Sequence, residues 1–424
     1  MAPTEHSPAT ASFDPKVLGR RLAEARSNAR LTQEQVADAL GLLRTAIAQI
    51  ETGARAVSSD ELVRLARLYG RSIDSFFEAE PDATVDDALT VLARMAPPVQ
   101  GDAETAKSIG ALIDVCRAGA SLKRELGLKN HDGPPAYEWP QPRNMGDAVE
   151  QGNIAAEQER KRLDLGEAPV ADIHELIARQ DIWAASDHLP DDVSGLFFSH
   201  QATGMVIVIN HDHHPCRQRF SYAHEYAHAL FDRKLKVTYT AKDNSTNLIE
   251  ARANAFAAAF LMPKRGVELA LERDDKGKPS KHLFSMYDVA NEGGTDVERR
   301  TTAASQRLGV KDVARLALHF DVSYQVACFR LKSLSFINQA ELNELRDREE
   351  AARLFMRIAR GDQAAGQDRE TVLRQRFKNH IIAQMLPLIL EAYQREIISR
   401  GRVLELSALI GVQGSTILQI AQIR

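Results

Sequence analysis

The sequence has few cysteines and no long apolar run. Its 424 residues include three cysteines, Cys116, Cys216 and Cys328, which lie far apart and form no C-x-x-C pair. An odd and scattered set argues against a disulfide framework and for a reducing compartment. No stretch approaches the roughly 20 apolar residues of a membrane helix, and the N-terminus lacks the basic and apolar regions of a secretory signal. We therefore expect a cytoplasmic protein that does not contact a membrane.

The chain also has little net charge. The 54 Lys and Arg residues and the 58 Asp and Glu residues give a formal net charge of −4 at pH 7. This is the composition of an ordinary globular protein, without the strong positive charge of a tight monomeric nucleic-acid binder. The length is sufficient for two or three domains, each with an ample core.

The segment 219–231, RFSYAHEYAHALF, carries the pattern H-E-x-x-H and is typical of an apolar helix. Residues four apart lie on one face of a helix, so His224 and His228 can point imidazole nitrogens at the same zinc ion. Glu225 lies one step around the helix, where it can take a proton from a water molecule at the metal. The pattern therefore predicts a metal-dependent hydrolase with Glu225 as its catalytic base.

A catalytic zinc takes three protein ligands and keeps a position for water, so one more ligand is needed. Glu250 is the best candidate, because it opens an Ala-rich apolar run that we expect to be a buried helix ended by Pro263. Asn254 lies one turn later on the same face, where it can hydrogen-bond a ligating histidine. The segment HDHH at 211–214 is better interpreted as a polar loop, because adjacent side chains point in divergent directions.

The segments RFSYAHEYAH and EARANAFAAAFLMP resemble the ImmA/IrrE metallopeptidases, over about residues 153 to 336. The resemblance implies a zincin-like domain in which His224, His228 and Glu250 bind Zn2+ and Glu225 is the catalytic base. It also implies a narrow substrate, a repressor-type protein cleaved in response to stress or to a mobile element. Tyr226 departs from the family, where glycine is common nearby, but it occupies none of the four catalytic positions.

Residues 14–78 have the helical period of a small bundle, and they follow a leader at 1–13 whose composition predicts disorder. The segment TQEQ, from Thr32 to Gln35, is a capping box that opens a helix, and Gly41 makes the turn to a further helix at 42–51. Two short helices joined by a glycine turn are typical of a helix-turn-helix, whose second helix enters the major groove of DNA.

The segments LTQEQVADALG and AIAQIETGAR resemble the Xre/Cro-type DNA-binding domain. By that resemblance, Arg44, Thr45 and Gln49 face the base edges of double-stranded operator DNA, while Gln33 and Arg55 contact phosphates. Arginine suits guanine and glutamine suits adenine, because each can make two hydrogen bonds to those edges. The bundle is only slightly basic, so we expect a homodimer on a two-fold operator. The alternative is a helical bundle that binds a protein partner.

The remaining segments are less informative. We expect a helical linker region at 79–150, a peptidase domain at 151–336 and a helical C-terminal region at 337–424 that is regulatory or serves oligomerisation. Within these limits we expect helices near 85–95, 104–126, 154–163 and 172–179, strands at 195–198 and 205–209, a solvated loop at 272–279, and a helix-turn-helix-like segment at 313–334 that packs against the catalytic unit.

The sequence thus predicts a mainly α protein with a small β-sheet, of the α+β class. It combines an N-terminal helix-turn-helix bundle, a zincin-like metallopeptidase domain and a C-terminal helical region. The function it favours is a DNA-binding transcriptional regulator with zinc-dependent endopeptidase activity toward a repressor. An alternative stays open: a transcription factor whose metallopeptidase-like domain senses a ligand or partner without cleaving it, in a toxin-antitoxin or phage-defence system.

Overall fold

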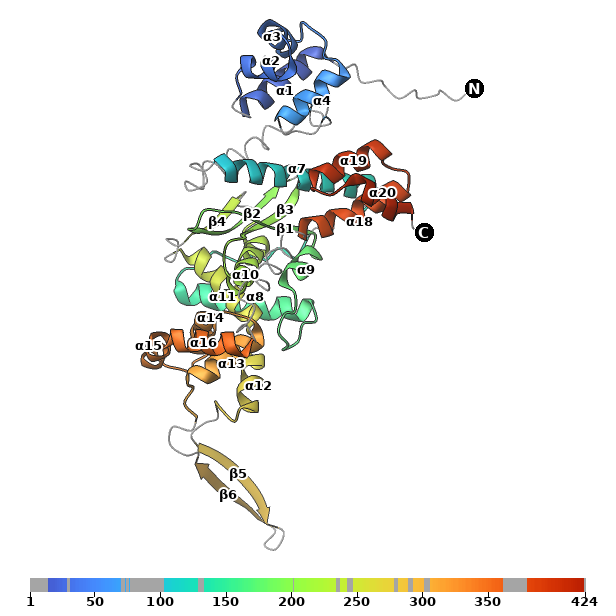
Figure 1. The fold of residues 1–424 in the computed structure, drawn as a ribbon. Helices are drawn as coiled ribbons and strands as arrows, with labels where there is room; N and C mark the ends of the chain where they lie inside the picture. The colour runs from blue at the N-terminus through green and yellow to red at the C-terminus, as the bar shows by residue number, and fades with distance from the viewer. Residues whose placement is uncertain are drawn as a thin grey trace.

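A computed structural model describes the fold of the chain. The residues that it describes are 14–28, 31–69, 73, 76, 103–128, 133–200, 202–233, 237–241, 247–277, 281–288, 293–300, 306–360 and 380–422. Within these ranges the chain is mainly helical, with one four-stranded sheet and one two-stranded sheet. The expected α+β class is confirmed (Figure 1). The expected leader at 1–13 and the expected helix at 85–95 lie outside the described residues.

The N-terminal bundle has the expected helix-turn-helix form. Its helices are α1 (Pro15–Asn28), α2 (Gln33–Leu40), α3 (Arg44–Glu51) and α4 (Ser59–Tyr69). The capping box of α2 is confirmed, because the Gln35 N–H donates to Thr32 Oγ1 at 3.2 Å and the Thr32 N–H donates to Gln35 Oε1 at 2.8 Å. Gly41 ends α2 with a φ of 71°, a conformation that glycine adopts without steric cost.

The main sheet lies between two helical layers (Figure 1). Its strands are β1 (Ile182–Asp187), β2 (Val193–His200), β3 (Gly204–Asn210) and β4 (Val237–Ala241), in the order β1-β3-β2-β4. β1 runs parallel to β3, and the other neighbours are antiparallel. The sequence predicted β2 and β3 but missed β1 and β4.

One face of the sheet packs against the helices that carry the expected zinc ligands. This layer comprises α8 (Met145–Arg162), α9 (Ile173–Ala178), α10 (Pro215–Phe231), α11 (Leu248–Leu261), α12 (Lys264–Arg273), α13 (Val310–Phe320), α14 (Tyr324–Ser333), α15 (Gln339–Asp347) and α16 (Glu349–Ala359). The expected domain limits at 150 and 336 stay predictions. α8 spans the first limit, and α15 and α16, which follow the second, contribute Leu342 and Met356 to this core.

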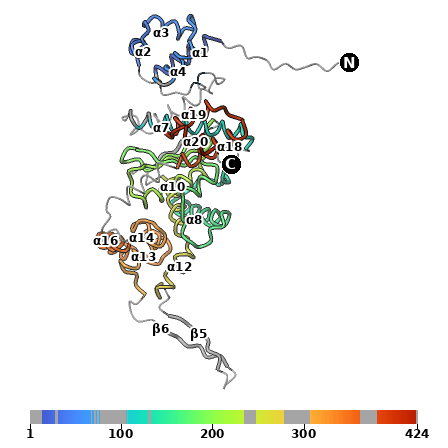
Figure 2. Tube along the Cα trace, turned by 45° about the vertical axis from the view of Figure 1, so that its right-hand side comes forward, coloured from blue at the N-terminus to red at the C-terminus, as the bar shows by residue number. Residues whose placement is uncertain are grey.

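The other face of the sheet is covered by α7 (Ala103–Glu125), α18 (His380–Gln394), α19 (Arg400–Leu409) and α20 (Gly414–Gln422). Figures 1 and 2 both show α7 and α18 side by side on this face, although they are far apart in sequence. Adjacent side chains of a strand alternate between the faces, so Leu196 packs in this layer and Phe197 in the zinc-side layer. Burial on both faces explains why the sequence of β3 is continuously apolar.

The edge of β1 is closed by a side chain of α18. Gln384 Nε2 donates to the Ala184 carbonyl at 2.9 Å, and Gln384 Oε1 accepts from the Ala184 N–H at 3.4 Å. A side-chain amide thus takes the place that a further strand would occupy, which protects an otherwise open edge.

An antiparallel hairpin of β5 (Lys281–Asp288) and β6 (Gly293–Arg300) follows α12 and was not expected from the sequence. The expected loop at 272–279 begins inside α12, which ends at Arg273. Across the described part of the chain, no helix is long and apolar enough to span a membrane.

Candidate metal centre

The helix α10 carries the H-E-x-x-H pattern through the centre of the fold. It begins at Pro215, earlier than the sequence indicated, with His214 as N-cap: its Nδ1 accepts the Cys216 N–H at 3.2 Å. Proline suits this first helical position, because its missing N–H would have no partner inside the helix. Both the sheet and α11 pack against α10, so every residue from Tyr222 to Leu230 is buried. The pattern is therefore held inside the protein.

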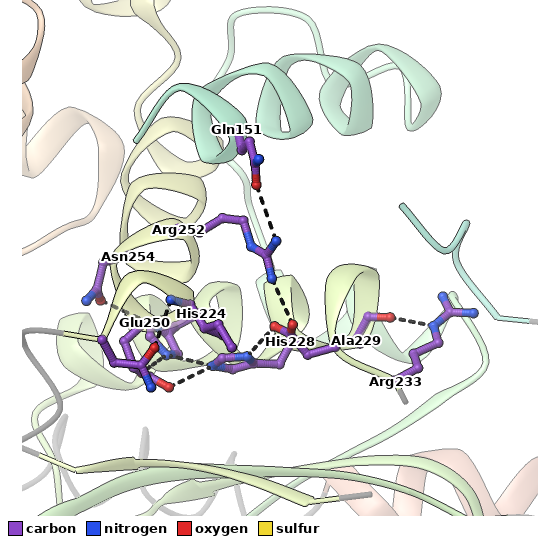
Figure 3. Close-up of polar contacts among 11 residues, drawn as sticks. Gln151, His224, His228, Ala229, Arg233, Glu250, Arg252 and Asn254 are labelled. Atoms are coloured by element: carbon purple, nitrogen blue, oxygen red, sulfur yellow. Dashed lines mark hydrogen bonds and ion pairs between the residues drawn. The ribbon is translucent and has the colours of Figure 1, made fainter. Parts of the chain in front are cut away.

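The structure brings His224, His228 and Glu250 together (Figure 3). His224 Nε2 lies 3.1 Å from Glu250 Oε2 and 3.2 Å from His228 Nε2. His228 Nε2 lies 3.5 Å from Glu250 Oε1. Glu250 comes from the first turn of α11, and the three side chains each offer an atom within 4.8 Å of the others. Among the described residues this is the one group of histidine, cysteine and acidic side chains arranged to hold a metal ion.

The orientation of the two imidazoles fits a metal. His224 Nδ1 lies 3.0 Å from Asn254 Oδ1, and His228 Nδ1 lies 2.9 Å from Asp232 Oδ2. Both partners are acceptors, so each Nδ1 donates to its partner and each Nε2 faces Glu250, where a metal ion would take its lone pair. Two imidazole nitrogens and one carboxylate form a ligand set that suits zinc. The hydrogen bond expected of Asn254 is present, and the three ligand assignments stay predictions.

Burial and neighbouring charges shift the pKa values of the candidate ligands His228 and Glu250 in opposite directions. Burial is the largest single influence on His228 and acts to lower its pKa, but the hydrogen bond to Asp232 and the charges of Glu225 and Glu250 raise the pKa above its ordinary value. Burial likewise acts to raise the pKa of Glu250, whereas the hydrogen bond and charge of His224 hold it below its ordinary value. The negative charge of the cluster therefore stabilises a cation at this site, either a proton or a metal ion.

A buried ion pair behind His228 was not anticipated from the sequence. Arg252 Nη2 donates to Asp232 Oδ1 at 2.8 Å, and Arg252 Nη1 donates to Gln151 Oε1 at 3.3 Å (Figure 3). The guanidinium also lies 4.2 Å from the centre of the Phe231 ring. Asp232 and Arg252 are 3% and 2% exposed, so the pair is fully desolvated. One signal was available: Asp232 lies four residues after His228, the spacing that places two residues on one helical face.

Glu225 lies against strand β2 and is fully buried. A β-carbon added at Gly195 would lie 2.7 Å from Glu225 Oε1 and 2.9 Å from Glu225 Cγ, closer than real contacts allow. Glycine at this position therefore makes room for the carboxylate beside the sheet. Sequence reasoning placed Gly195 at the start of a strand but gave it no role.

The residues expected to contact DNA fall into two groups. Arg44, Thr45 and Gln49 are exposed on α3, as the helix-turn-helix resemblance implies. Gln33 and Arg55 are engaged within the bundle: Gln33 Nε2 donates to Glu51 Oε2 at 2.7 Å, and Arg55 Nη2 donates to Glu61 Oε1 at 2.7 Å. A phosphate contact from either would have to exchange or share these bonds, and both assignments stay predictions.

The segment 211–214 forms the turn between β3 and α10, as expected of a polar loop. Gln218 Nε2 donates to the carbonyls of His211 and His213, at 2.7 Å each, while Asp212 accepts from His188 Nδ1 at 2.8 Å. His214 caps α10. The contacts of this segment thus hold the turn and the start of α10.

Comparison with known families follows the same division. A family model described as an IrrE N-terminal-like domain, of the M78 peptidases, matches residues 184–332, and a helix-turn-helix domain model matches residues 17–75. The chain joins a helix-turn-helix domain to an IrrE-like peptidase domain. These matches support a DNA-binding regulator that carries a metallopeptidase-like domain. The peptidase match contains all the candidate metal ligands and Glu225, and the helix-turn-helix match contains most of α1 and all of α2 to α4.

Two further comparisons add little. No curated protein matches the chain. The crystal structure of ComR from Streptococcus suis aligns over 96% of each chain, but at 10% identity and with a TM-score of 0.15, which is too low to establish a shared fold. The IrrE-like and helix-turn-helix domains therefore rest on the two family matches and on the geometry described above.

Proposed function

We propose that this protein is a transcriptional regulator whose peptidase domain is a zinc-dependent endopeptidase acting on a repressor-type protein. One observation supports it above all. Three ligand atoms from α10 and α11 converge in a buried site, where Asn254 and Asp232 orient the two histidines. The helix α10 also carries the buried carboxylate of Glu225. A domain that only senses a partner needs no general base, whereas a hydrolase does.

His224, His228 and Glu250 would hold the zinc ion, with Asn254 and Asp232 fixing the two imidazoles. When bound, zinc acts as a Lewis acid toward a carbonyl oxygen and lowers the pKa of water. Glu225 accepts the proton of the attacking water and then delivers it to the nitrogen of the leaving amine. The proton removed from water thus ends on the new amino terminus, and the water oxygen ends in the new carboxylate.

The substrate is an extended peptide that pairs with the edge of the sheet. Gln384 occupies the edge at β1, so the edge for an incoming strand is that of β4, at the other end of the strand order. β4 pairs with β2, and β2 carries Gly195 against Glu225. A peptide added beside β4 is held by main-chain hydrogen bonds, which leaves specificity to its side chains.

The helix-turn-helix domain directs the protein to an operator. Arg44, Thr45 and Gln49 are exposed along α3 and can reach base edges in the major groove. A homodimer would place two such helices on a two-fold operator and offset the weak binding of one slightly basic bundle. We place this activity in the cytoplasm, where operator DNA and a repressor substrate are both accessible.

The decisive experiment replaces Glu225 with Gln in the full chain. Glutamine keeps the side-chain size but cannot accept the proton, so zinc content and operator binding should persist while cleavage is lost. The variant should also retain its substrate, which can be cross-linked in cells and identified by mass spectrometry. The competing function is a sensor that cleaves nothing: if cells carrying Glu225→Gln derepress their target genes normally, the endopeptidase proposal fails and the sensor stands.

A further inference from the structure

The helix α16 has apolar side chains on two different faces. Ala352 and Met356 are buried in the core of the zinc-side layer, where α16 packs on α13 and α14. A second set repeats at i, i+3, i+4 and i+7, the spacing of one helical face. Its members, which we call the α16 stripe, are Ala351, Leu354, Phe355 and Ile358. The helix therefore carries more apolar surface than its packing in this layer uses.

The α16 stripe faces outward. Leu354 is 54% exposed and Ile358 is 49% exposed, and Ala351 is exposed as well. Phe355 is half-buried and packs on the edge of the core. In Figure 2, α16 lies at the outer margin of the zinc-side layer. Apolar side chains that keep the helical spacing at the surface are typical of a helix that docks on another molecule.

Charged side chains border the α16 stripe in a fixed order. The first turn of α16 is acidic, with Glu349 and Glu350, and the turns that follow are basic, with Arg353 and Arg357. Glu349 Oε1 accepts from Arg353 Nη2 at 2.8 Å, so these two form a pair within the helix. Glu350 and Arg357 are exposed and lie two helical turns apart, along the same edge of the stripe. One end of this edge is therefore negative and the other end is positive.

This order of charges is complementary to itself. When two copies of α16 lie antiparallel, the same edge of each helix faces that edge of the other, so Glu350 of each copy lies opposite Arg357 of the other copy. Leu354 lies close to the two-fold axis, and Ala351 of each copy packs on Ile358 of the other. A parallel pair would instead bring like charges to the same level. A two-fold interface of this kind uses one surface twice, as most homodimers do.

We propose that the α16 stripe is the interface through which two copies of this chain associate. This inference rests on the proposed function, in which a homodimer binds a two-fold operator. The occupant of the stripe is a second copy, because the charges that border it match in the antiparallel arrangement. α16 has 11 residues and is roughly 16 Å long, so the interface is small and the dimer exchanges with monomers at micromolar concentrations. An operator that holds both copies would strengthen the dimer.

The first test measures self-association of the full chain by sedimentation velocity at about 1 to 100 μM, a range that suits small interfaces. The original protein should change from monomer to dimer within this range. Leu354→Glu places two carboxylates against each other at the axis, and it should raise the dissociation constant at least about tenfold, the value of one buried leucine. The matched control is Leu128→Glu after α7, because Leu128 is 43% exposed and lies outside the stripe. The control should stay within about twofold of the original protein.

A charge exchange tests the antiparallel arrangement. Glu350→Arg sets arginines against each other in both pairs, and Arg357→Glu does the same with glutamates. Each change should raise the dissociation constant by about threefold to tenfold, as expected when two surface ion pairs become repulsive. The double variant restores both pairs in reverse and should return to within about twofold of the original protein. Thermal unfolding checks that each variant folds.

The outcomes separate this interface from the proposed DNA binding, which is measured as selection of duplexes from a randomised pool. A full chain that stays monomeric at every concentration overturns the interface, and so does a dimer that Leu354→Glu leaves unchanged. A double variant as weak as the single variants overturns the antiparallel arrangement. Loss of the dimer in Leu354→Glu, together with no selected duplex, supports the interface and removes the DNA-binding proposal. A monomer that selects a duplex does the reverse.

Discussion

Asp232 and His228 form a buried pair one helical turn apart, with Asp232 Oδ2 2.9 Å from His228 Nδ1. The contact fixes which imidazole nitrogen faces Glu250. Asp232→Ala should therefore lower zinc affinity by about 10- to 100-fold, the usual effect of removing such a partner. Titration with a competing chelator measures it. Zinc affinity equal to that of the original protein would show that Asp232 has no part in metal binding.

Removal of Arg252 should affect stability more than zinc affinity. Arg252→Met leaves the Asp232 carboxylate buried without its Nη2 donor at 2.8 Å, and breaking a buried pair in this way costs about 3 to 5 kcal/mol. Urea unfolding of the metal-free protein gives the loss. The control is Arg265→Met, whose ion pairs with Glu268 and Glu272 are at the surface and should contribute little to stability. Equal losses for the two variants would contradict the prediction.

His228→Ala tests the ligand set itself. The change removes one of three converging atoms, so the protein should be purified with clearly less than one zinc per chain. Atomic emission spectrometry on the purified protein gives the ratio, and Glu225→Gln is the control that should keep its zinc. Full occupancy in His228→Ala would mean that the ligand assignment is wrong.

Gly195→Ala should impair cleavage while zinc stays bound. The added β-carbon would stand 2.7 Å from Glu225 Oε1, so the carboxylate must move. A displacement of about 1 Å in a catalytic group can cost about 100-fold in rate. Gly110→Ala on α7, where a β-carbon meets nothing within 4 Å, is the matched control. Cleavage of the substrate captured by Glu225→Gln is the assay, and equal rates for the two alanine variants would show that Glu225 does not need this space.

The start of α4 should make the N-terminal bundle sensitive to acid. The Ser58 N–H donates to Glu61 Oε2 at 2.9 Å, and this bond, followed by that from Arg55, lowers the pKa of Glu61. A carboxyl with a lowered pKa in the folded state stabilises the fold above its ordinary value of 4.5, and the contribution is lost as pH falls below it. Glu61→Gln should therefore lower stability by about 1 kcal/mol at pH 7 and much less at pH 3. Thermal unfolding at the two pH values checks it.

The sequence was most informative where local chemistry determines structure. The capping box at Thr32 and the glycine turn at Gly41 depend on residues within a few positions of each other, and both are present in the structure. The helical spacing of His224 and His228 is local as well. For such features, side-chain type and separation along the chain suffice.

Features that depend on distant segments could not be predicted. β1 is short and follows a polar turn, and its pairing with β3 depends on helices that cover both faces of the sheet. The role of Arg252 requires knowing that α11 lies beside the end of α10, and that of Gly195 requires the approach of Glu225 to β2. In the hairpin β5–β6, the sequence of β6, GGTDVERR, is charged and has no apolar alternation, so its period gave no strand signal.

Because helices cover both faces of the sheet, the segment that matches the peptidase family is not sufficient to bury the sheet by itself. The family match ends at residue 332 and begins at 184, so it includes neither α7 nor α18. A fragment limited to that span would leave Leu196, Val206 and Val208 facing water, side chains that are now fully buried. Apolar sheet faces of this kind associate with one another. The matched segment therefore does not bury its own sheet: it requires α7 from before it and α18 to α20 from after it.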